Sequence, residues 1–291
     1  MHNSAENPQG EANPMARTVA DLVAAAIATE STADTPTAVR SVFYIEHGTR
    51  LGTRVGTGGE DVVYRNRYVL ARIGTSFGAC ACEAGAVGPE VADFSGMPAA
   101  DILTQAPAEV RMAVLDAWLA EHAPHRSHPL ATSVELPTGT PLQRALARDA
   151  AIVDLVAPQV GDTIAVVGVV TPLVEGLLRR GAHPRLCDRN AETCVGLPVE
   201  QDLDAVLTGA DRVLATGMTV SDGSFDVIRQ HCLSTNAPLY IYAQSGTAIV
   251  RDFLGAGVRG MTAEHFPFSQ FSADATPMYV YRTGQEGTRE L

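Results

Sequence analysis

Lysine is absent from the 291-residue sequence, so all 21 of its basic side chains other than histidine are arginines. Three kinds of catalytic site depend on a lysine ammonium group. They are the phosphate-binding loop of nucleoside triphosphatases, the strand lysine of kinases and the Schiff base of pyridoxal enzymes. The sequence therefore excludes all three, whatever caused the bias toward arginine.

The sequence also lacks a long apolar run, although 46% of its residues are hydrophobic. A membrane-spanning helix needs about 20 consecutive apolar residues, so we expect a globular chain without a membrane span. Residues 1–16 are rich in Asn, Glu, Pro and Gly and have neither a basic nor an apolar segment. This composition is typical of a disordered tail and not of a signal peptide.

Charge and cysteine content narrow the expected partners. The net charge of −12 argues against nucleic acid as a partner. Five cysteines at irregular spacing fit a reducing cytoplasm better than a disulfide framework. We expect a cytoplasmic protein whose partner is a small molecule, with no nucleic acid and no membrane. A homodimer is one assembly that the sequence allows.

The clearest structural signal is a strand–helix–strand unit between Asp162 and Asp188. Residues 164–170 are apolar and rich in β-branched side chains, as in a parallel strand covered on both faces. Pro172 suits the first turn of a helix, and Gly181 suits the residue after its end. The second strand ends at Asp188. The unit therefore places a candidate site beyond the end of its first strand.

Strand and helix patterns alternate on both sides of this unit. They predict an α/β fold, with a Rossmann-like open parallel sheet in residues 138–291 and a smaller α+β domain in residues 17–137. The proline-rich segment 124–141 is expected to be the linker. We expect helices over 18–29, 98–103, 108–119, 141–156, 202–207, 226–233 and 248–254, and strands over 39–45, 62–73, 185–188, 212–215, 238–243 and 258–261.

Three loops that follow predicted strands are expected to face one crevice. Each places small or hydroxyl side chains and exposed backbone N–H groups before a helix, which favours an anionic or polar ligand. The alternative interpretation is that the hydroxyls and acids are helix N-caps. The candidate ligand-binding residues are Gly168, Val170, Thr171, Asp188, Thr216, Gly217, Met218, Thr219, Asp222, Ser245, Gly246 and Thr247.

The spacing of Gly168 and Asp188 suggests an adenosine-bearing ligand. Adenosine-binding folds place an acid about twenty residues after the first glycine, where it binds the ribose hydroxyls. The turn lacks the G-x-G-x-x-G signature, which argues against a dinucleotide. S-adenosylmethionine needs no pyrophosphate turn, so it is a candidate cofactor. A plain helix–strand packing turn is the alternative.

Histidines offer two further candidates. Glu264 and His265 follow the last predicted strand among several phenylalanines, so His265 is a candidate general base with Glu264 beside it. The alternative is an aromatic core with a capping histidine. His122, His125 and His128 lie in a short proline-bounded segment that could hold a transition metal. Solvated histidines in a linker are the alternative there.

The glycine-rich segment 74–88 carries two chemical patterns. Gly74-Thr-Ser-Phe-Gly78 matches the G-x-S-x-G nucleophile elbow, but no helical pattern follows it, so a serine hydrolase is not favoured. Cys80, Cys82 and Glu83 are candidate metal ligands. A closed zinc site would need further ligands at motif spacing. Small buried cysteines are therefore the alternative.

Three segments resemble a known two-domain family of bacteria and archaea. They are Thr75-Ser-Phe-Gly-Ala-Cys-Ala-Cys-Glu-Ala-Gly, Asp93-Phe-Ser-Gly-Met-Pro-Ala-Ala-Asp-Ile-Leu and Ala215-Thr-Gly-Met-Thr-Val-Ser-Asp-Gly-Ser. The most specific is the T-G-x-T-x-x-[ND]-G pattern that begins at Thr216. The family is labelled "putative heavy-metal chelation". The resemblance implies an enolase-N-terminal-like α+β domain, a Rossmann-like C-terminal domain and a cleft between them.

Two classes of function follow from these observations. In the first, the protein binds a small ligand, such as a metal ion or a metal complex, with Cys80, Cys82, Glu83 or His265 as metal ligands at the domain junction. In the second, it is a transferase or lyase of specialised metabolism that uses S-adenosylmethionine. The sequence does not decide between them, and it does not establish whether the protein is an enzyme.

Overall fold

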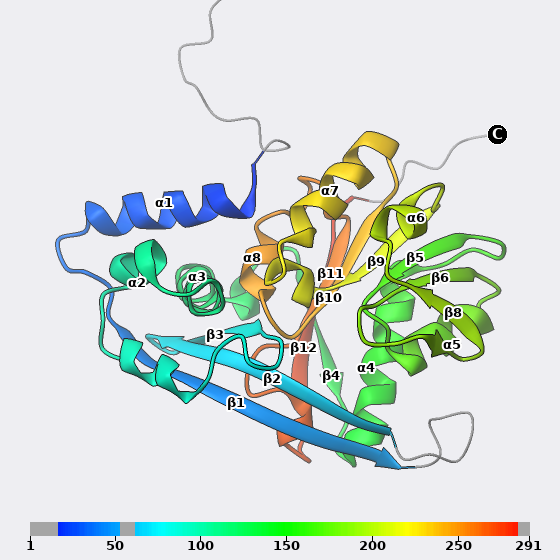
Figure 1. Ribbon diagram of the computed structural model, residues 1–291, viewed down its shortest axis with the longest axis horizontal. Coiled ribbons are helices and arrows are strands. Elements are labelled where there is room, and N and C mark those ends of the chain that lie inside the picture. The colour runs from blue at the N-terminus through cyan, green and yellow to red at the C-terminus, as the bar shows by residue number, and fades with distance from the viewer. Residues whose placement is uncertain (1–16, 53–61, 285–291) are drawn as a thin grey trace, which may run out of the picture.

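The computed structural model describes residues 17–52 and 62–284, so the predicted tail of residues 1–16 lies outside the described residues. Two sheets form the framework (Figure 1). The smaller sheet is antiparallel and has the order β1-β2-β3. Its strands are β1 (Val39–Gly52), β2 (Val62–Ile73) and β3 (Ser76–Ala81).

The larger sheet has nine strands in the order β4-β12-β11-β10-β9-β5-β6-β8-β7. The six strands from β8 to β11 are parallel. Their order is that of a doubly wound Rossmann-like sheet and reverses between β5 and β9, where such sheets bind ligands. The predicted α/β fold with a large, mostly parallel sheet is confirmed. The strands are β4 (Ala131–Leu136), β5 (Thr163–Val167), β6 (His183–Cys187), β7 (Thr193–Cys194), β8 (Leu197–Glu200), β9 (Arg212–Thr216), β10 (Leu239–Ala243), β11 (Gly260–Ala263) and β12 (Thr276–Arg282).

Helices cover both faces of the larger sheet. Ile164 and Val166 of β5 pack into the core beneath α4 (Pro141–Val156) and α5 (Thr171–Arg179). Ala165, between them, packs into the core on the opposite face. This burial on both sides explains the nearly continuous apolar run of β5. The opposite face is covered by α6 (Leu203–Leu207), α7 (Ser224–Thr235) and α8 (Thr247–Arg251).

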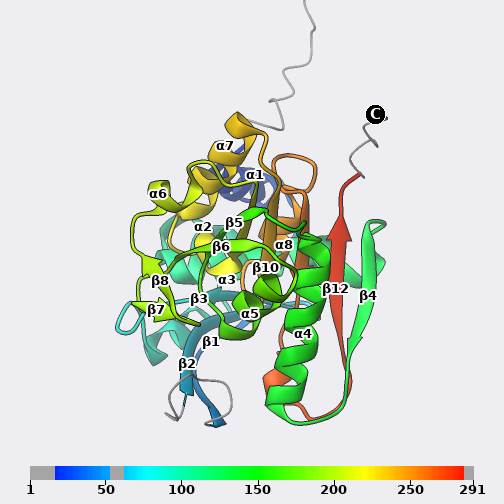
Figure 2. The same ribbon diagram turned by 90° about the vertical axis from the view of Figure 1, so that its right-hand side faces the viewer.

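The same core continues into the N-terminal half. One cluster of buried side chains joins the helices on the smaller sheet to α7, α8 and the larger sheet. Figure 2 shows β4 and β12 beside α4 at one edge of the larger sheet. The segment 124–141 was predicted to be a linker. That prediction is wrong, because β4 within this segment pairs with β12 in the larger sheet. The N-terminal helices are α1 (Val19–Ser31), α2 (Ala99–Gln105) and α3 (Ala108–His122).

Helix α3 packs directly on β3 because Gly78 has no side chain. A Cβ atom there would lie 2.1 Å from Ala117 N and 2.3 Å from Ala113 O. Asp116 of α3 then joins the two halves, since its carboxylate accepts hydrogen bonds from Ala79 N at 2.9 Å and Ala248 N at 2.7 Å. Gly74 lies in the turn between β2 and β3, so the G-x-S-x-G pattern forms a hairpin and not a nucleophile elbow.

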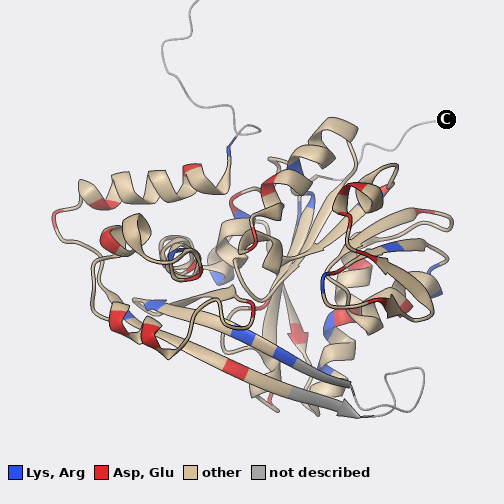
Figure 3. Cartoon of the chain, in the orientation of Figure 1, with Lys and Arg blue, Asp and Glu red and all other residues tan. Residues whose placement is uncertain are grey.

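Acidic and basic residues are interspersed over the elements of both sheets that the structure describes (Figure 3). Within those elements, no helix is both long and apolar enough to cross a membrane.

Candidate functional site

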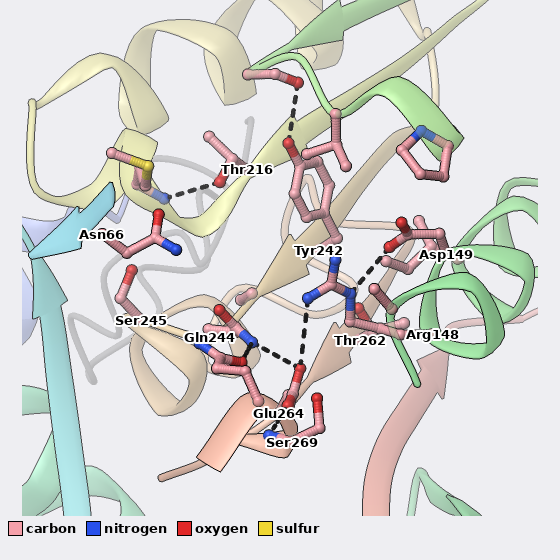
Figure 4. Close-up of a pocket in the computed structure, with 18 of the residues that line it drawn as sticks. Asn66, Arg148, Asp149, Thr216, Tyr242, Gln244, Ser245, Thr262, Glu264 and Ser269 are labelled. Atoms are coloured by element: carbon pink, nitrogen blue, oxygen red, sulfur yellow. Dashed lines mark hydrogen bonds and ion pairs between the residues drawn. The ribbon is translucent and has the colours of Figure 1, made fainter. Parts of the chain in front are cut away.

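A cavity of about 240 Å³ lies at the carboxyl ends of β5, β9 and β10, where the smaller sheet approaches them (Figure 4). Strand β2 and helix α4 complete its wall, so both halves of the chain contribute. The strand order reverses at this place, as expected for a ligand site in a doubly wound sheet. The polar or charged lining residues are Asn66, Tyr68, Arg148, Asp149, Asp188, Thr216, Tyr242, Gln244, Ser245, Thr262, Glu264, Ser269 and Gln270.

Half of the predicted ligand-binding residues line this cavity. Gly168, Val170, Asp188, Thr216, Met218 and Ser245 do so. The others are Thr171, Gly217, Thr219, Asp222, Gly246 and Thr247, and they are not among its lining residues. The cavity therefore lies at strand ends that the sequence pointed to. The sequence did not separate the side chains that face the cavity from their neighbours.

Several of the non-lining residues have structural roles. Thr219 donates a hydrogen bond to Thr216 O at 2.7 Å, and Thr247 is hydrogen-bonded to the ring of His125 at 3.1 Å. Asp222 accepts a hydrogen bond from Ser224 N at the start of α7, at 2.9 Å, and forms an ion pair with Arg189 at 3.2 Å. Thr219 and Asp222 therefore bond to nearby backbone groups, although neither is the N-cap residue that the alternative interpretation expected.

Asp188 lies in the cavity wall and holds the loop after β5. One carboxylate oxygen accepts a hydrogen bond from Val169 N at 2.9 Å, and the other accepts one from Asn190 N at 2.8 Å. Each oxygen therefore has a backbone donor. Asp188 can still contact a ligand through its remaining lone pairs, because a carboxylate offers about four acceptor sites.

Gly168 is required at the turn because its neighbours leave no room for a side chain. Its φ is +83°, and a Cβ atom would lie 2.6 Å from Thr216 Cγ2. The Tyr242 hydroxyl donates to Gly168 O at 2.9 Å. The glycine therefore permits close packing of the turn onto two neighbouring strands, a role that does not require a pyrophosphate.

A buried ion cluster lies at the α4 side of the cavity. Figure 4 shows Arg148 connected to Asp149 on one side and to Glu264 on the other. Arg148 Nε donates to Asp149 Oδ1 at 2.9 Å, and Nη1 lies 3.9 Å from Glu264 Oε2. Burial raises the pKa of Asp149, although Arg148 opposes that shift. Burial disfavours the charged form of Arg148, but Asp149 and Glu264 raise its pKa overall.

A second network fixes Glu264. Its Oε1 accepts a hydrogen bond from Ser269 N, and its Oε2 accepts one from Gln244 Nε2 at 2.8 Å. Gln244 Nε2 also donates to Gln270 Oε1 at 3.0 Å, while Gln244 Oε1 accepts from the Tyr68 hydroxyl at 3.1 Å. Glu264, a candidate catalytic residue, thus lines the cavity with both oxygens hydrogen-bonded.

His265 is not among the residues that line the cavity. Its ring stacks on Tyr279, with 5.7 Å between the ring centroids, and burial lowers its pKa. Its buried Nδ1 has no hydrogen-bond partner among the described residues. The structure therefore does not bring the two candidate catalytic residues together at one cavity.

The predicted metal ligands also lie away from the cavity. Cys80 and Cys82 face the helix-covered core of β3, whereas Ala79 and Ala81 face the other side. Burial raises the pKa of both thiols, that of Cys82 to about 11, which disfavours the thiolate that a metal binds. Glu83 is exposed. No group of three or more His, Cys, Asp and Glu residues in 17–52 and 62–284 could hold a metal ion.

The histidine-rich segment contributes to packing. His125 is buried, and its two ring nitrogens are hydrogen-bonded to the Tyr281 hydroxyl at 2.6 Å and to Thr247. Burial lowers its pKa well below the ordinary value. This side chain is therefore not a solvated linker histidine.

Sequence reasoning named Glu264 but missed Arg148, Asp149 and most of the opposite wall. One signal for Arg148 and Asp149 was present, because both precede Ile152 on the predicted helix by one turn. They place charges on the face of the helix that is otherwise apolar. Asn66, Tyr68 and Gln244 gave no signal, since only the approach of β2 to the end of β10 brings them together.

Comparisons with known proteins agree with the fold. Residues 151–240 match the DUF364 family model, described as "Putative heavy-metal chelation". A structure of unknown function from the same family, from Desulfitobacterium hafniense DCB-2, has a TM-score of 0.59 at 15% identity and covers 91% of this chain and 98% of that chain. A second, from Pyrococcus horikoshii, has a TM-score of 0.54 at 12% identity and covers 91% and 100%. No curated protein matches the sequence. At these identities the solved structures show the fold alone.

Proposed function

The resemblance to the heavy-metal-chelation family is confirmed, and from that premise we propose that the protein binds a small polar ligand in the cavity between its two sheets. The ion cluster in the cavity wall carries the proposal. Arg148, Asp149 and Glu264 have side-chain exposures of 20%, 2% and 3%. Burying charged groups costs free energy, and perturbed ionisable groups that gather in a cleft indicate a functional site.

A metal would enter this cavity as a complex whose own organic ligands supply most of its donor atoms. Asp149 and Glu264 are the carboxylates closest to Arg148, and a bare divalent cation between them would be repelled by the guanidinium group. The cysteines face another core, where burial raises the pKa of both thiols. The chemistry of this wall suits hydrogen bonding to a complex better than direct coordination of an ion.

S-adenosylmethionine is a second candidate ligand. The observation in its favour is that Asp188 lines the same cavity, after the second strand of the parallel sheet. Ribose hydroxyls could donate to the lone pairs that Val169 N and Asn190 N leave open.

A thermal-shift screen of the metal-stripped protein distinguishes these ligands. The probes are nickel and zinc ions alone, the cationic ethylenediamine complexes of the same metals, S-adenosylmethionine and NAD. A ligand that binds only the folded protein raises Tm. We expect the complexes to raise Tm more than the bare ions do. We also expect Asp149→Asn to remove that increase, while the double variant Cys80→Ala/Cys82→Ala retains it.

Other results would point elsewhere. An increase in Tm with bare ions that the double cysteine variant abolishes would favour direct metal binding by the thiols and contradict the proposal. An increase with S-adenosylmethionine that Asp188→Asn abolishes would favour the second candidate. If no probe raises Tm, the proposed ligand-binding function fails.

A further inference from the structure

The charge of the cavity wall is negative. Its lining includes one basic side chain, Arg148, and three acidic ones, Asp149, Asp188 and Glu264, which gives 1 − 3 = −2 when all are ionised. The chain has no lysine that could add a positive charge. Electrostatic interactions are stronger at a partly buried site than in water. The wall therefore opposes the anionic ligand expected at helix N-termini and favours a cation.

One acceptor in this wall has no donor. Asp149 is 2% exposed, and its Oδ1 accepts from Arg148 Nε at 2.9 Å. Its Oδ2 is buried and has no hydrogen-bond partner among the described residues. Buried carboxylate oxygens are almost always hydrogen-bonded, and leaving one unpaired is costly. Because Asp149 lines the cavity, a ligand bound there could supply the missing donor.

The other two acids in the wall are already satisfied. Both oxygens of Asp188 accept from backbone N–H groups, and both oxygens of Glu264 accept from Ser269 and Gln244. Arg148 holds Asp149 in position through Oδ1 and leaves Oδ2 unpaired. The orientation of Asp149 is therefore set before a ligand arrives.

The rest of the wall suits a compact, partly apolar molecule. Ile152 and Met278 contribute aliphatic surface, and Tyr68 and Tyr242 contribute aromatic surface. Aromatic rings attract cations, especially at desolvated sites. A volume of about 240 Å³ is small for a ligand pocket.

We infer that the cavity binds a small organic amine, whose positively charged nitrogen donates a hydrogen bond to Asp149 Oδ2 while its carbon skeleton packs on the tyrosines and aliphatic side chains. This inference rests on the proposed ligand-binding function and specifies the chemical class of the ligand. An amine coordinated to a metal presents the same N–H donors, so the inference agrees with the binding of a cationic complex.

Three probes of similar shape test which ligand charge the cavity prefers. Benzylamine is a cation, benzyl alcohol is neutral and benzoate is an anion at neutral pH. Their dissociation constants are measured on the full chain by ligand-observed NMR at constant ionic strength. We expect benzylamine to bind at least tenfold more tightly than benzyl alcohol, and benzoate not to bind. This ranking needs no variant, so it tests the inference even if a substitution in the cavity prevents folding.

Two isosteric variants test whether Asp149 is the residue that binds the amine. Asp149→Asn removes the charge and should weaken benzylamine binding at least tenfold. Glu175→Gln, on the exposed face of α5 where Glu175 pairs with Arg179, should leave it unchanged. Benzyl alcohol or benzoate binding as tightly as benzylamine would overturn the amine inference and leave the ligand-binding function standing. An unchanged affinity in folded Asp149→Asn would also overturn it. If none of the three probes binds, the inference fails, and the thermal-shift panel separately decides the proposed function.

Discussion

The hydroxyl of Tyr68 on β2 donates a 3.1 Å hydrogen bond to Oε1 of Gln244, the residue that directly follows β10. Tyr68 belongs to the smaller sheet, and Gln244 lies 176 positions later, next to a strand of the larger sheet. Gln244 Nε2 donates a hydrogen bond to Glu264 Oε2, and that oxygen lies 3.9 Å from Arg148 Nη1. These residues therefore form one polar network within the cavity wall, and the network needs both halves of the chain.

Replacing Tyr68 with phenylalanine should weaken this network. The change leaves Gln244 Oε1 without its donor, so we expect Tyr68→Phe to lower the free energy of unfolding by about 1–3 kcal/mol. Urea unfolding measures the effect. Tyr44→Phe is the matched control, because the hydrogen bond of the Tyr44 hydroxyl to Glu46 is exposed and 3.4 Å long. Equal losses in the two variants would argue against the role of the Tyr68–Gln244 bond.

A methyl group at Gly78 should separate α3 from β3. The added Cβ would lie 2.1 Å from the backbone nitrogen of Ala117, so either β3 or α3 must move. We expect Gly78→Ala to lower the free energy of unfolding by about 3 kcal/mol or more. Gly48→Ala in β1 is the control, since a Cβ there meets nothing within 4 Å. The prediction fails if both variants unfold at the same urea concentration.

Arg144 should be essential for the loop that carries Ser269 and Gln270. Its side chain is 0% exposed and donates to Ser269 O at 3.1 Å, to Pro137 O at 2.6 Å and to Asp274 O. Arg144→Met leaves these buried carbonyls without donors. We therefore expect a loss of roughly 3 kcal/mol in unfolding free energy.

The matched control for Arg144 is Arg126→Met, because Arg126 is exposed. It should unfold like the unmodified protein in a thermal melt. A melting temperature of Arg144→Met equal to that of the control would show that the loop does not depend on these hydrogen bonds.

The pH dependence of the unfolding free energy should reveal the raised pKa of Asp116. Burial raises the pKa of its carboxyl from 3.8 to about 6, although backbone N–H groups oppose the shift. The folded protein therefore holds this proton more tightly than the unfolded chain does. The resulting stabilisation is complete below the unfolded pKa of 3.8 and is lost as pH rises through about 6. The shift corresponds to roughly 3 kcal/mol.

Asp116→Asn removes this titration while keeping the shape of the side chain. We expect the difference in unfolding free energy between the unmodified protein and Asp116→Asn to narrow by up to about 3 kcal/mol as pH rises from roughly 4 to roughly 7. Urea titrations at several pH values measure this difference. A difference that stays constant, or widens with pH, would show that Asp116 is not protonated preferentially in the folded state.

Local signals in the sequence predicted the elements around the site well. Helix α4 begins and ends where expected, because Thr140 caps it and Pro141 occupies its first turn. The strand–helix–strand unit from β5 to β6 also agrees, since its apolar run and its turn residues are short-range patterns.

Strands β3, β4 and β12 were missed for a physical reason. Apart from Phe77, β3 consists of small residues without alternation. Its place depends on pairing with β2 and on the close approach of α3 to Gly78. β12 pairs with β4, which lies far from it in the sequence. Such pairing energy comes from distant partners, so local propensity does not report it.

The sequence by itself determined the alternating strands and helices, the strand ends at which a site could form, and the exclusion of chemistries that need lysine. Only the tertiary structure decided which side chains face that site. It placed Arg148, Asp149 and Glu264 in one wall, and it turned Cys80 and Cys82 toward a different core. The reason is that patterns along the chain reflect short-range forces. The side chains that share a cavity are selected by packing between elements that are more than a hundred residues apart, as Arg148 and Glu264 are.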